Sequence, residues 1–315
     1  MSKYLITGGQ GFVGNYLIKY LLDNYTRIEI YSISHTNSSK IIKGVNYEII
    51  DLLNTSDIER FILRIKPDFI FHLAAMSSVS QSWQNPAMSF SNNINIFINL
   101  LEAVRKSGIY CKILSIGSSE VYGIINSNEI PINENHATNP ISPYAVARVS
   151  QELISKVYIE GFKLKIILTR SFNHIGPGQD IRFAIPNFLK ESINRVKQKS
   201  IAPIETGDLN IIRDFVDVRD VVVAYDLLIK SGQIGEIYNI CSSYGISLKS
   251  ITDKIKQLTG IKNEFITKSE LIRPIDNPII IGDYSKLKKT VGWKPTISID
   301  ESLKEMYIYQ LDSND

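Results

Sequence analysis

The chain has 315 residues, 44% of them hydrophobic, which is enough to bury a large core in one domain or in two closely joined domains. Lysines and arginines are interspersed with acidic residues to give a net charge of only +3, so the sequence shows neither the basic stripe of a nucleic-acid-binding protein nor the basic block of a membrane-surface protein. Cys111 and Cys241 are the only cysteines, and the four histidines show no metal-ligand spacing, so we expect no disulfide framework and no metal site.

The first residues of the chain and its hydropathy predict where in the cell the protein is located. Residues 4–7 (Tyr-Leu-Ile-Thr) already read as a strand, so we expect no signal peptide. No apolar run reaches the length of a membrane span. We therefore expect a cytoplasmic, soluble protein with reduced thiols, and neither nucleic acid nor a membrane as a partner.

Short apolar runs alternate with longer amphipathic stretches along the first half of the chain. The apolar runs predict buried strands at residues 3–7, 27–33, 46–50, 68–74, 111–117 and 165–172. The stretches between them predict helices at residues 12–23, 56–65, 86–106 and 143–161. Strands that alternate with helices need crossover connections, so the predicted fold class is α/β, with a Rossmann-like doubly wound parallel sheet covered on both faces.

The first predicted strand is followed directly by Gly8-Gly-Gln-Gly11-Phe-Val-Gly14 and then by the first predicted helix. Glycines at these positions allow a tight turn and a close approach of the backbone to a pyrophosphate, and the helix presents free amide groups at its amino terminus. This order of strand, turn and helix predicts a dinucleotide site with contacts from Gly8, Gly11, Phe12, Val13 and Gly14. The alternative is a glycine-rich surface turn.

The end of the second strand lacks the carboxylate that holds the adenosine ribose in sites that prefer NAD. Residues 32–35 are Ser-Ile-Ser-His, and Glu29 lies too early in the strand for that role. The missing carboxylate leaves room for a ribose phosphate, so we expect NADP as the cofactor, with NAD as the alternative, and Ser34 as a contact. Lys40 is a further candidate for the phosphate, although loop lysines are usually only solvated.

Tyr144 and Arg148 lie four residues apart on the helix predicted at 143–161 and therefore share one face of it. A cation beside a phenol favours the ionised form, which makes the hydroxyl a usable acid and base at neutral pH. The pair predicts a catalytic tyrosine with a cationic partner. The alternative is an ordinary helix with an interfacial tyrosine and a solvated arginine.

The pattern changes in the second half, which begins with a Gly-Pro-Gly run and continues with scattered short strands and helices. We expect residues 1–170 to form a dinucleotide-binding domain and residues 171–315 to form a smaller mixed α/β carboxyl-terminal substrate domain. Part of 212–240 is expected to return to the first domain. Asp217 and Asp220 read as the acidic start of a helix and not as catalytic residues.

Several separate motifs, in matching order and spacing, resemble the extended short-chain dehydrogenase/reductase family over nearly the whole chain. They are the glycine loop, Asp51-Leu52, His72-Leu-Ala-Ala75, Asn93, Ser118-Ser-Glu-Val-Tyr-Gly123 and Tyr144 with Arg148, where the family usually has lysine in place of the arginine. The resemblance implies that the cofactor is contacted by Asp51, Leu52, Leu73, Ala74, Ala75, Asn93, Tyr144 and Arg148. It also implies that Ser118 and Tyr144 contact the oxygen on the reacting sugar carbon.

Within this family, the second half is most similar to GDP-6-deoxy-4-keto-mannose reductases and to their sister group, the GDP-mannose 4,6-dehydratases. The matching stretches are Thr169-Arg-Ser-Phe-Asn-His-Ile-Gly-Pro-Gly-Gln179, Gly207-Asp-Leu-Asn-Ile-Ile-Arg-Asp-Phe215, Arg273-Pro-Ile-Asp276 and Gly292-Trp-Lys-Pro295. The resemblance implies a GDP-sugar substrate bound in residues 171–315, with contacts from Ser119, Asn173, Lys190, Arg213 and Arg273. The chain departs from the family at Asp208, where asparagine is usual, and at Ile96-Phe97, where a Gly-Thr pair is usual.

The predicted activity is the NADPH-dependent reduction of the C4 ketone of a GDP-4-keto-6-deoxy sugar, with Ser118, Tyr144 and Arg148 at the reacting carbon. Glu120 stands where the dehydratases keep a base, so a GDP-mannose 4,6-dehydratase is an alternative. The arginine at position 148 leaves a third alternative, a catalytically silent dinucleotide-binding sensor or scaffold. The sequence leaves the stereochemistry at C4 open. The apolar helices at 86–106 and 143–161 favour a homodimer.

Overall fold

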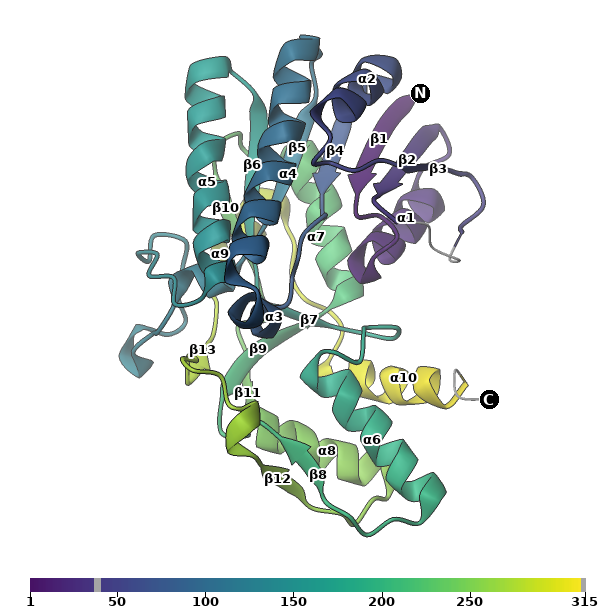
Figure 1. Ribbon diagram of the computed structural model, residues 1–315, viewed down its shortest axis with the longest axis vertical. Coiled ribbons are helices and arrows are strands. Elements are labelled where there is room, and N and C mark those ends of the chain that lie inside the picture. Colours follow the sequence, from purple (N-terminus) through teal and green to yellow (C-terminus); the bar gives the residue numbers. More distant parts are fainter. Residues whose placement is uncertain (37–40, 313–315) are drawn as a thin grey trace.

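The computed structural model describes residues 1–36 and 41–312, and it folds into two lobes (Figure 1). The strands of the larger lobe are β1 (Ser2–Thr7), β2 (Ile28–Ser34), β3 (Val45–Ile49), β4 (Phe69–His72), β5 (Lys112–Ser118), β6 (Lys165–Ser171) and β10 (Ile237–Ile240). Its helices are α1 (Phe12–Asn24), α2 (Thr55–Ile65), α3 (Val79–Gln84), α4 (Pro86–Ser107), α5 (Pro143–Phe162), α7 (Val218–Ser231) and α9 (Ser285–Val291). Each predicted strand and helix of the first half is present within a few residues of its expected ends, which confirms the α/β class.

The order of the strands places a ligand crevice in the larger lobe. Within the described ranges, seven parallel strands pair in the order β10-β6-β5-β4-β1-β2-β3. Strand β1 pairs with β2 on one side and with β4 on the other, so the direction in which the chain adds strands reverses there. Doubly wound sheets bind ligands outside the carboxyl ends of the strands at such a reversal. The predicted Rossmann-like doubly wound sheet is confirmed.

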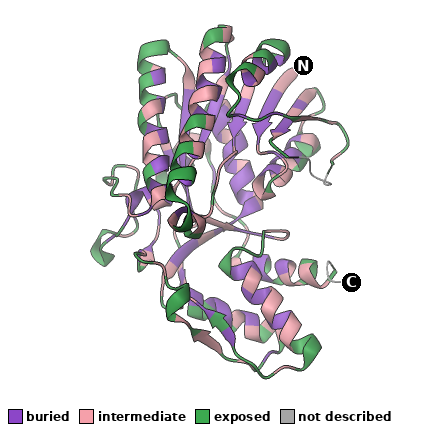
Figure 2. Ribbon diagram, in the orientation of Figure 1, coloured by how far each residue is buried: buried purple, intermediate pink, exposed green. Residues whose placement is uncertain are grey.

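The sheet is covered on both faces, which is why its strands read as continuous apolar runs. Helices α1, α7 and α9 cover one face, where Leu17, Val221 and Leu287 are fully buried. Helices α2, α4 and α5 cover the other, where Phe61 and Leu100 belong to the core. Figure 2 shows the buried colour along much of the sheet between these two layers.

Helix α5 begins at a position that its local sequence determines. Ser142 caps it by accepting a hydrogen bond from the Ala145 amide at 3.1 Å. Pro143 takes the first helical position, where its missing N–H group would have had no partner within the helix. Tyr144 is therefore held in the first turn of α5, beside the carboxyl ends of the parallel strands that this helix connects.

The smaller lobe is a mixed α/β arrangement, as predicted. Its helices are α6 (Ala184–Gln198), α8 (Leu248–Thr259) and α10 (Ile299–Asp312), and its strands are β7 (Asn173–Ile175), β8 (Ile204–Thr206), β9 (Ile212–Asp217), β11 (Gly245–Ser247), β12 (Phe265–Thr267) and β13 (Ile279–Ile280). Strand β9 pairs in parallel with β7 and β13 and antiparallel with β11, while β8 pairs with β12. Phe188, Ile251 and Leu303 belong to a core of its own.

The chain passes between the lobes more than once. Strand β6 ends at Ser171, next to the boundary expected at residue 170. Of the segment 212–240, β9 lies in the smaller sheet, whereas α7 packs against α1 and β10 pairs with β6. The division into domains 1–170 and 171–315 stays a prediction.

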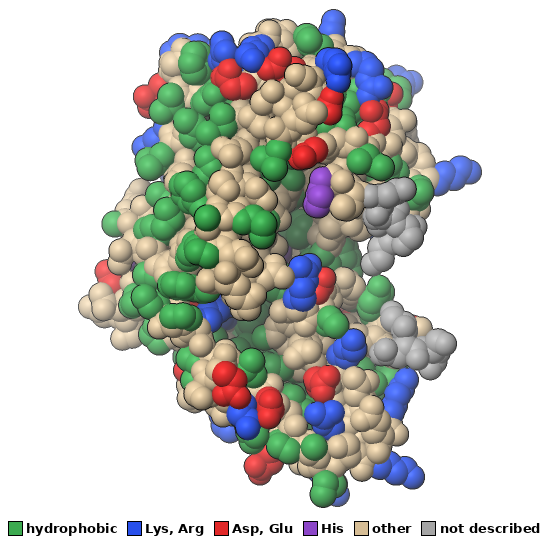
Figure 3. Space-filling model, in the orientation of Figure 1, with side chains coloured by type: hydrophobic (Ala, Val, Ile, Leu, Met, Phe, Trp, Pro, Cys, Tyr) green, Lys and Arg blue, Asp and Glu red, His purple; other side chains and the backbone are tan. Residues whose placement is uncertain are grey.

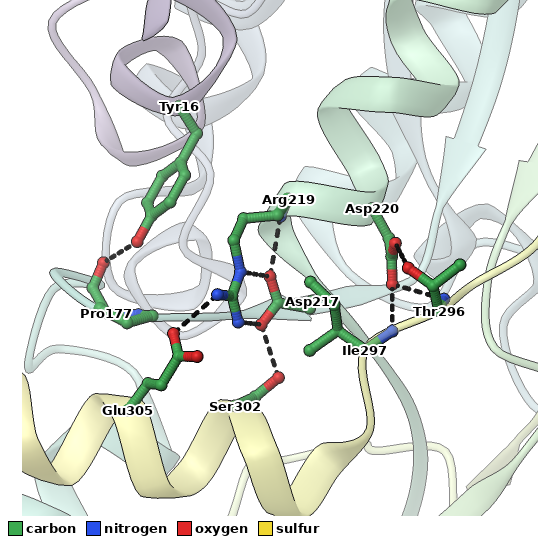
Figure 4. A network of polar contacts seen from close by, with 9 residues as sticks. All are labelled: Tyr16, Pro177, Asp217, Arg219, Asp220, Thr296, Ile297, Ser302 and Glu305. Carbon is green, nitrogen blue, oxygen red and sulfur yellow. Dashed lines mark hydrogen bonds and ion pairs between the residues drawn. The ribbon is translucent and has the colours of Figure 1, made fainter. Parts of the chain in front are cut away.

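A polar network ties α7 to α10 (Figure 4). Asp217 caps α7 by accepting a hydrogen bond from the Arg219 amide at 2.8 Å, and it also accepts one from the Ser302 hydroxyl at 2.6 Å. Arg219 pairs in turn with Glu305 at 2.7 Å. Asp220 lies in the first turn of α7. Both acids therefore mark the helix start that the sequence predicts.

Candidate functional site

A cleft of about 1870 Å³ lies between the lobes, and the molecule is visibly hollowed there (Figure 3). It is lined from the larger lobe by the ends of β1, β2, β4 and β5 and from the smaller lobe by β9 and α6. The predicted site residues that line it are Gly8, Gly11, Phe12, Val13, Gly14, Ser34, Asp51, Leu52, Leu73, Ala74, Ala75, Ser118, Glu120, Tyr144, Arg148, Asn173, Lys190, Arg213 and Arg273. The structure thus brings nearly all of them to one surface.

The glycine loop has a geometry that other residues could not adopt. Gly8 has a φ of +69°, and a Cβ added there would lie 2.9 Å from the backbone nitrogen of Ala74. A Cβ added to Gly14 would lie 2.5 Å from the Cα of Gly9, so α1 can begin only because that side chain is missing. The loop therefore exposes backbone to the cleft at the start of a helix, which is the surface that a dinucleotide pyrophosphate requires.

The end of β2 presents hydroxyl groups to the cleft. The Ser34 hydroxyl donates a hydrogen bond to the Gln10 side chain at 2.7 Å, and His35 and Thr36 also line the wall. None of these described residues is acidic. Asp51, after β3, accepts a hydrogen bond from the Leu53 amide at 2.9 Å. Lys40 lies outside the described residues.

Asn93, on α4, is 2% exposed and does not line the cleft. Its side-chain oxygen accepts a hydrogen bond from the Met76 amide at 2.9 Å, and its nitrogen donates to the Met76 carbonyl at 3.3 Å. Met76 lines the cleft next to Ala74 and Ala75. The structure therefore places Asn93 behind the loop after β4, which it holds in shape, and not at the expected cofactor surface.

Ser118, Tyr144 and Arg148 meet where β5 ends and α5 begins. Ser118 is the last residue of β5, and Tyr144 is 6% exposed and lines the cleft. Arg148 is 4% exposed, and its guanidinium carbon lies 5.0 Å from the centroid of the Tyr144 ring. Arg148 also donates a hydrogen bond to the Ile116 carbonyl at 3.2 Å. The interpretation of Arg148 as a solvated arginine is therefore wrong, because the side chain is buried against the tyrosine.

Two hydroxyl groups beside this pair are not among the predicted site residues. The Tyr225 hydroxyl, on α7, lies 2.9 Å from that of Ser171, and both residues line the cleft. Ser171 sits opposite Ser118 in the pairing of β5 with β6. Tyr225 is fully buried, which raises its pKa, so it stays a neutral hydroxyl near Tyr144.

A cluster of charged side chains lines the cleft beside Glu120. Arg213 is 4% exposed and pairs with Asp276 at 2.7 Å, while Arg273 approaches the same carboxylate oxygen at 3.4 Å. Glu120 lines the cleft nearby, where burial raises its pKa and the charges of Arg273 and Arg213 partly offset that effect. Two arginine forks beside a single aspartate leave N–H groups that suit phosphate oxygens.

The remaining predicted substrate contacts differ in their exposure. Asn173 and Lys190 line the cleft. Ser119 lies in the 3₁₀ turn η1 (Ser119–Tyr122) and is 3% exposed, which disfavours a direct sugar contact. Asp208 does not line the cleft, because its carboxylate accepts hydrogen bonds from the backbone and side chain of Asn210.

The Ile96-Phe97 departure alters packing beside the cofactor end of the cleft. Ile96 lines the cleft, and Phe97 is fully buried with its ring centroid 5.0 Å from that of His72.

Among the described residues, no helix is both long and apolar enough to cross a membrane. No group of three or more His, Cys, Asp or Glu side chains in residues 1–36 and 41–312 could hold a metal ion.

Comparisons with known proteins agree with the family resemblance found in the sequence. A family model for GDP-mannose 4,6 dehydratase matches residues 5–306. GDP-6-deoxy-D-mannose reductase of Pseudomonas aeruginosa is 30% identical over 306 residues, which cover 96% of this chain and 95% of the relative. GDP-6-deoxy-D-talose 4-dehydrogenase of Aggregatibacter actinomycetemcomitans is 30% identical over 313 residues and 97% of each chain.

The fold comparison extends over the whole chain. The solved structure of RMD from Pseudomonas aeruginosa complexed with NADPH aligns with a TM-score of 0.86 at 28% identity, over 99% of this chain and 100% of that one. Matches of this length include both lobes and every lining element of the cleft. The chain therefore belongs to the GDP-mannose 4,6-dehydratase family of extended short-chain dehydrogenases/reductases, whose members are NAD(P)-dependent enzymes of nucleotide sugars.

Proposed function

We propose that the protein uses NADPH to reduce the C4 ketone of a GDP-4-keto-6-deoxy sugar, giving a product of the GDP-6-deoxy-D-mannose type. The observation that carries the proposal is that Tyr144 and Ser118 line the same cleft as Arg213 and Arg273. A ketone on a sugar that is joined to a diphosphate needs both pairs of residues at once. The 30% identity to a GDP-6-deoxy-D-mannose reductase supports this choice of substrate class.

The cofactor end of the cleft fits a dinucleotide. The glycine loop would hold the pyrophosphate, because Gly8 and Gly14 leave backbone where side chains would otherwise stand. Asp51, Leu52 and Ala74 would flank the adenosine half, and Ser34 without an acidic neighbour favours the phosphorylated cofactor. When bound, the reduced nicotinamide supplies the hydride that adds to the ketone carbon.

The proton that completes the alcohol comes from the protein. Tyr144 donates its hydroxyl proton to the C4 oxygen, and Ser118 stabilises the same oxygen with a hydrogen bond as negative charge develops there. The Arg148 guanidinium, 5.0 Å from the Tyr144 ring, stabilises the phenolate that remains. Arg148 acts through its charge and its N–H groups.

The diphosphate binds at Arg213 and Arg273. Arg213 is already oriented by its ion pair with Asp276, so little side-chain freedom remains to be lost when a phosphate binds. Arg273 is about one-third exposed and can turn its fork toward the ligand. Asn173 and Lys190 complete this part of the wall.

Glu120 favours a second candidate, GDP-mannose 4,6-dehydratase. Elimination of water from the sugar needs a base that removes a proton beside a transient ketone. Glu120 is a cleft carboxyl group whose pKa is raised by burial, which is a suitable setting for such a base. A third candidate, a silent dinucleotide-binding sensor or scaffold, depends on whether the arginine at position 148 allows turnover.

Two incubations separate the three candidates. With GDP-4-keto-6-deoxymannose and NADPH, the proposed reductase consumes NADPH, and NMR shows a new proton on C4 of the product. With GDP-mannose and NADP+ but no NADPH, a dehydratase forms the 4-keto-6-deoxy sugar and the reductase forms nothing. A protein that binds NADPH but turns over neither substrate would leave only the silent sensor.

We also propose a homodimer formed through α4 and α5. Both helices carry large apolar side chains that are well exposed in the single chain, among them Phe90, Leu153 and Val157. Leu153 and Val157 are four residues apart on α5 and therefore share one face of the helix. Leu153 is 60% exposed and Val157 is 55% exposed. A second copy of the chain would cover such a stripe.

A further inference from the structure

A second polar side chain of α5, Gln151, is buried beside Arg148 although no motif singles it out. Gln151 is 2% exposed and lies three residues after Arg148. Its amide oxygen accepts a hydrogen bond from Nη1 of Arg148. Its amide nitrogen donates to the Ser115 hydroxyl at 2.7 Å and to the Ile116 carbonyl at 3.1 Å. Since two acceptors face the nitrogen, the oxygen must face the guanidinium.

These contacts decide which part of Arg148 faces the cleft. Nη1 donates hydrogen bonds to the Gln151 side-chain oxygen and, at 3.2 Å, to the Ile116 carbonyl. Nε is buried and has no hydrogen-bond partner among the described residues. Within the same residues, Nη2 makes no hydrogen bond to the protein, and Arg148 lines the cleft. Nη2 is therefore the nitrogen that is left for a ligand.

An arginine in this place needs an anchor that a lysine would not need. The guanidinium carries five N–H donors in one rigid plane, and buried donors without acceptors are costly. A wrong rotation of the plane would also move its charge away from Tyr144. The lysine ammonium is a compact group with three rotatable donors, so its direction matters less. Among the described residues, Gln151 supplies the one side-chain acceptor that holds the plane of Arg148.

We propose that Gln151 is a positioning residue that allows Arg148 to work at the catalytic site. It holds Nη1 against β5, so that Nη2 points to the cofactor and the charge stays over the Tyr144 ring. The effect on turnover rests on the proposed reductase function, whereas the effect on cofactor binding does not. Loss of the Gln151 oxygen should therefore matter only while residue 148 is arginine.

The test is a double-mutant cycle between Q151L and R148K on the full chain. Two quantities are measured: the NADPH dissociation constant by fluorescence titration, and kcat with GDP-4-keto-6-deoxymannose. In the wild-type background, Q151L should weaken NADPH binding and lower kcat by about tenfold each, because a buried hydrogen bond to a charged group is lost. In the R148K background, the same change should alter both by less than about twofold. Equal losses in the two backgrounds would overturn the proposal.

Two further variants separate positioning from general destabilisation. Ser155 is fully buried one turn later, and its hydroxyl donates a hydrogen bond to the backbone carbonyl of Gln151 at 2.7 Å. The S155A variant therefore removes a buried hydrogen bond of the same helix without touching Arg148. S155A should keep wild-type NADPH affinity and kcat. Q151E keeps an acceptor facing Arg148 and loses the N–H donor to Ser115 and Ile116, so its NADPH affinity and kcat should lie closer to those of wild type than the tenfold losses expected for Q151L. A loss in Q151E as large as that expected for Q151L would refute the role of the oxygen.

The two proposals can fail separately. If the wild-type protein binds NADPH but reduces no GDP-4-keto sugar, the proposed function fails, and the NADPH cycle still decides the role of Gln151. If the wild type turns over and the NADPH cycle is additive, the function stands and the role of Gln151 fails.

Discussion

Replacing Gly8 with alanine tests how the glycine loop is built. Gly8 has a φ of +69°, and an added Cβ would lie 2.9 Å from the Ala74 nitrogen and 3.2 Å from the Leu73 carbonyl carbon. These are backbone atoms, which cannot turn away as a side chain can. Gly108, at the end of α4, has nearly the same φ of +65°, and an added Cβ there has nothing within 4 Å. Gly108→Ala is therefore a matched control that carries only the cost of the left-handed backbone.

The expected magnitudes follow from that comparison. The left-handed conformation costs an alanine about 1–2 kcal/mol, so Gly108→Ala should lower the free energy of unfolding by that amount and leave NADPH affinity unchanged. Gly8→Ala should add about 1–3 kcal/mol, because the backbone at Leu73 and Ala74 must move. Since both residues line the cleft, the NADPH dissociation constant should rise by at least about tenfold.

Urea unfolding followed by circular dichroism measures the first quantity, and NADPH fluorescence titration measures the second. If Gly8→Ala and Gly108→Ala lost the same stability and both kept wild-type NADPH affinity, the close approach of the loop to Ala74 would have no energetic consequence. The reasoning from the loop geometry would then be refuted.

Three further changes test the site and its surroundings. Tyr144→Phe should lower turnover by at least about 100-fold with unchanged NADPH affinity, because only the proton donor is lost, and retained turnover would contradict its role. Burial and the Arg148 charge lower the pKa of His72 from 6.5 to about 3, so below pH 6.5 the unfolded chain takes up a proton there that the folded chain does not. Between pH 7 and pH 5 the wild type should therefore lose about 2 kcal/mol more unfolding free energy than His72→Gln, and equal losses in urea titrations would count against this. Leu153→Glu should convert the proposed dimer to a monomer in light scattering, whereas Ile201→Glu, at a position 96% exposed elsewhere, should not; a dimer in both variants would place the interface on another face.

Much of the larger lobe could be predicted because its signals are local. The alternation of apolar runs and amphipathic stretches depends on neighbouring residues, and the strands and helices of the first half appear where the periodicity places them. The turn after β1 and the cap at Ser142 are equally local, so the loop at Gly8 and the place of Tyr144 on α5 were open to prediction. Asp217 at the start of α7 is a further example.

The predictions failed or fell short where a residue's role depends on distant partners. The motif predicts that Asn93 contacts the cofactor, yet its side-chain amide is hydrogen-bonded to the backbone of Met76, 17 residues earlier. Asp208 departs from the asparagine that is usual in the family, and only the structure shows that it accepts hydrogen bonds within its own turn, from Asn210. The pairing of Arg213 with Asp276 spans 63 residues and has no counterpart in local sequence.

The sequence by itself determined the secondary structure of the first half, the doubly wound sheet and the presence of a tyrosine and a cation on one helix face, because these depend on periodicity and on turn chemistry within a few residues. Only the tertiary structure decided that Arg148 is buried over the Tyr144 ring and held through Gln151 against Ser115, 36 residues earlier on β5. The physical reason is that a buried charge must find its hydrogen-bond acceptors in space, and the packing of α5 on the sheet supplies them.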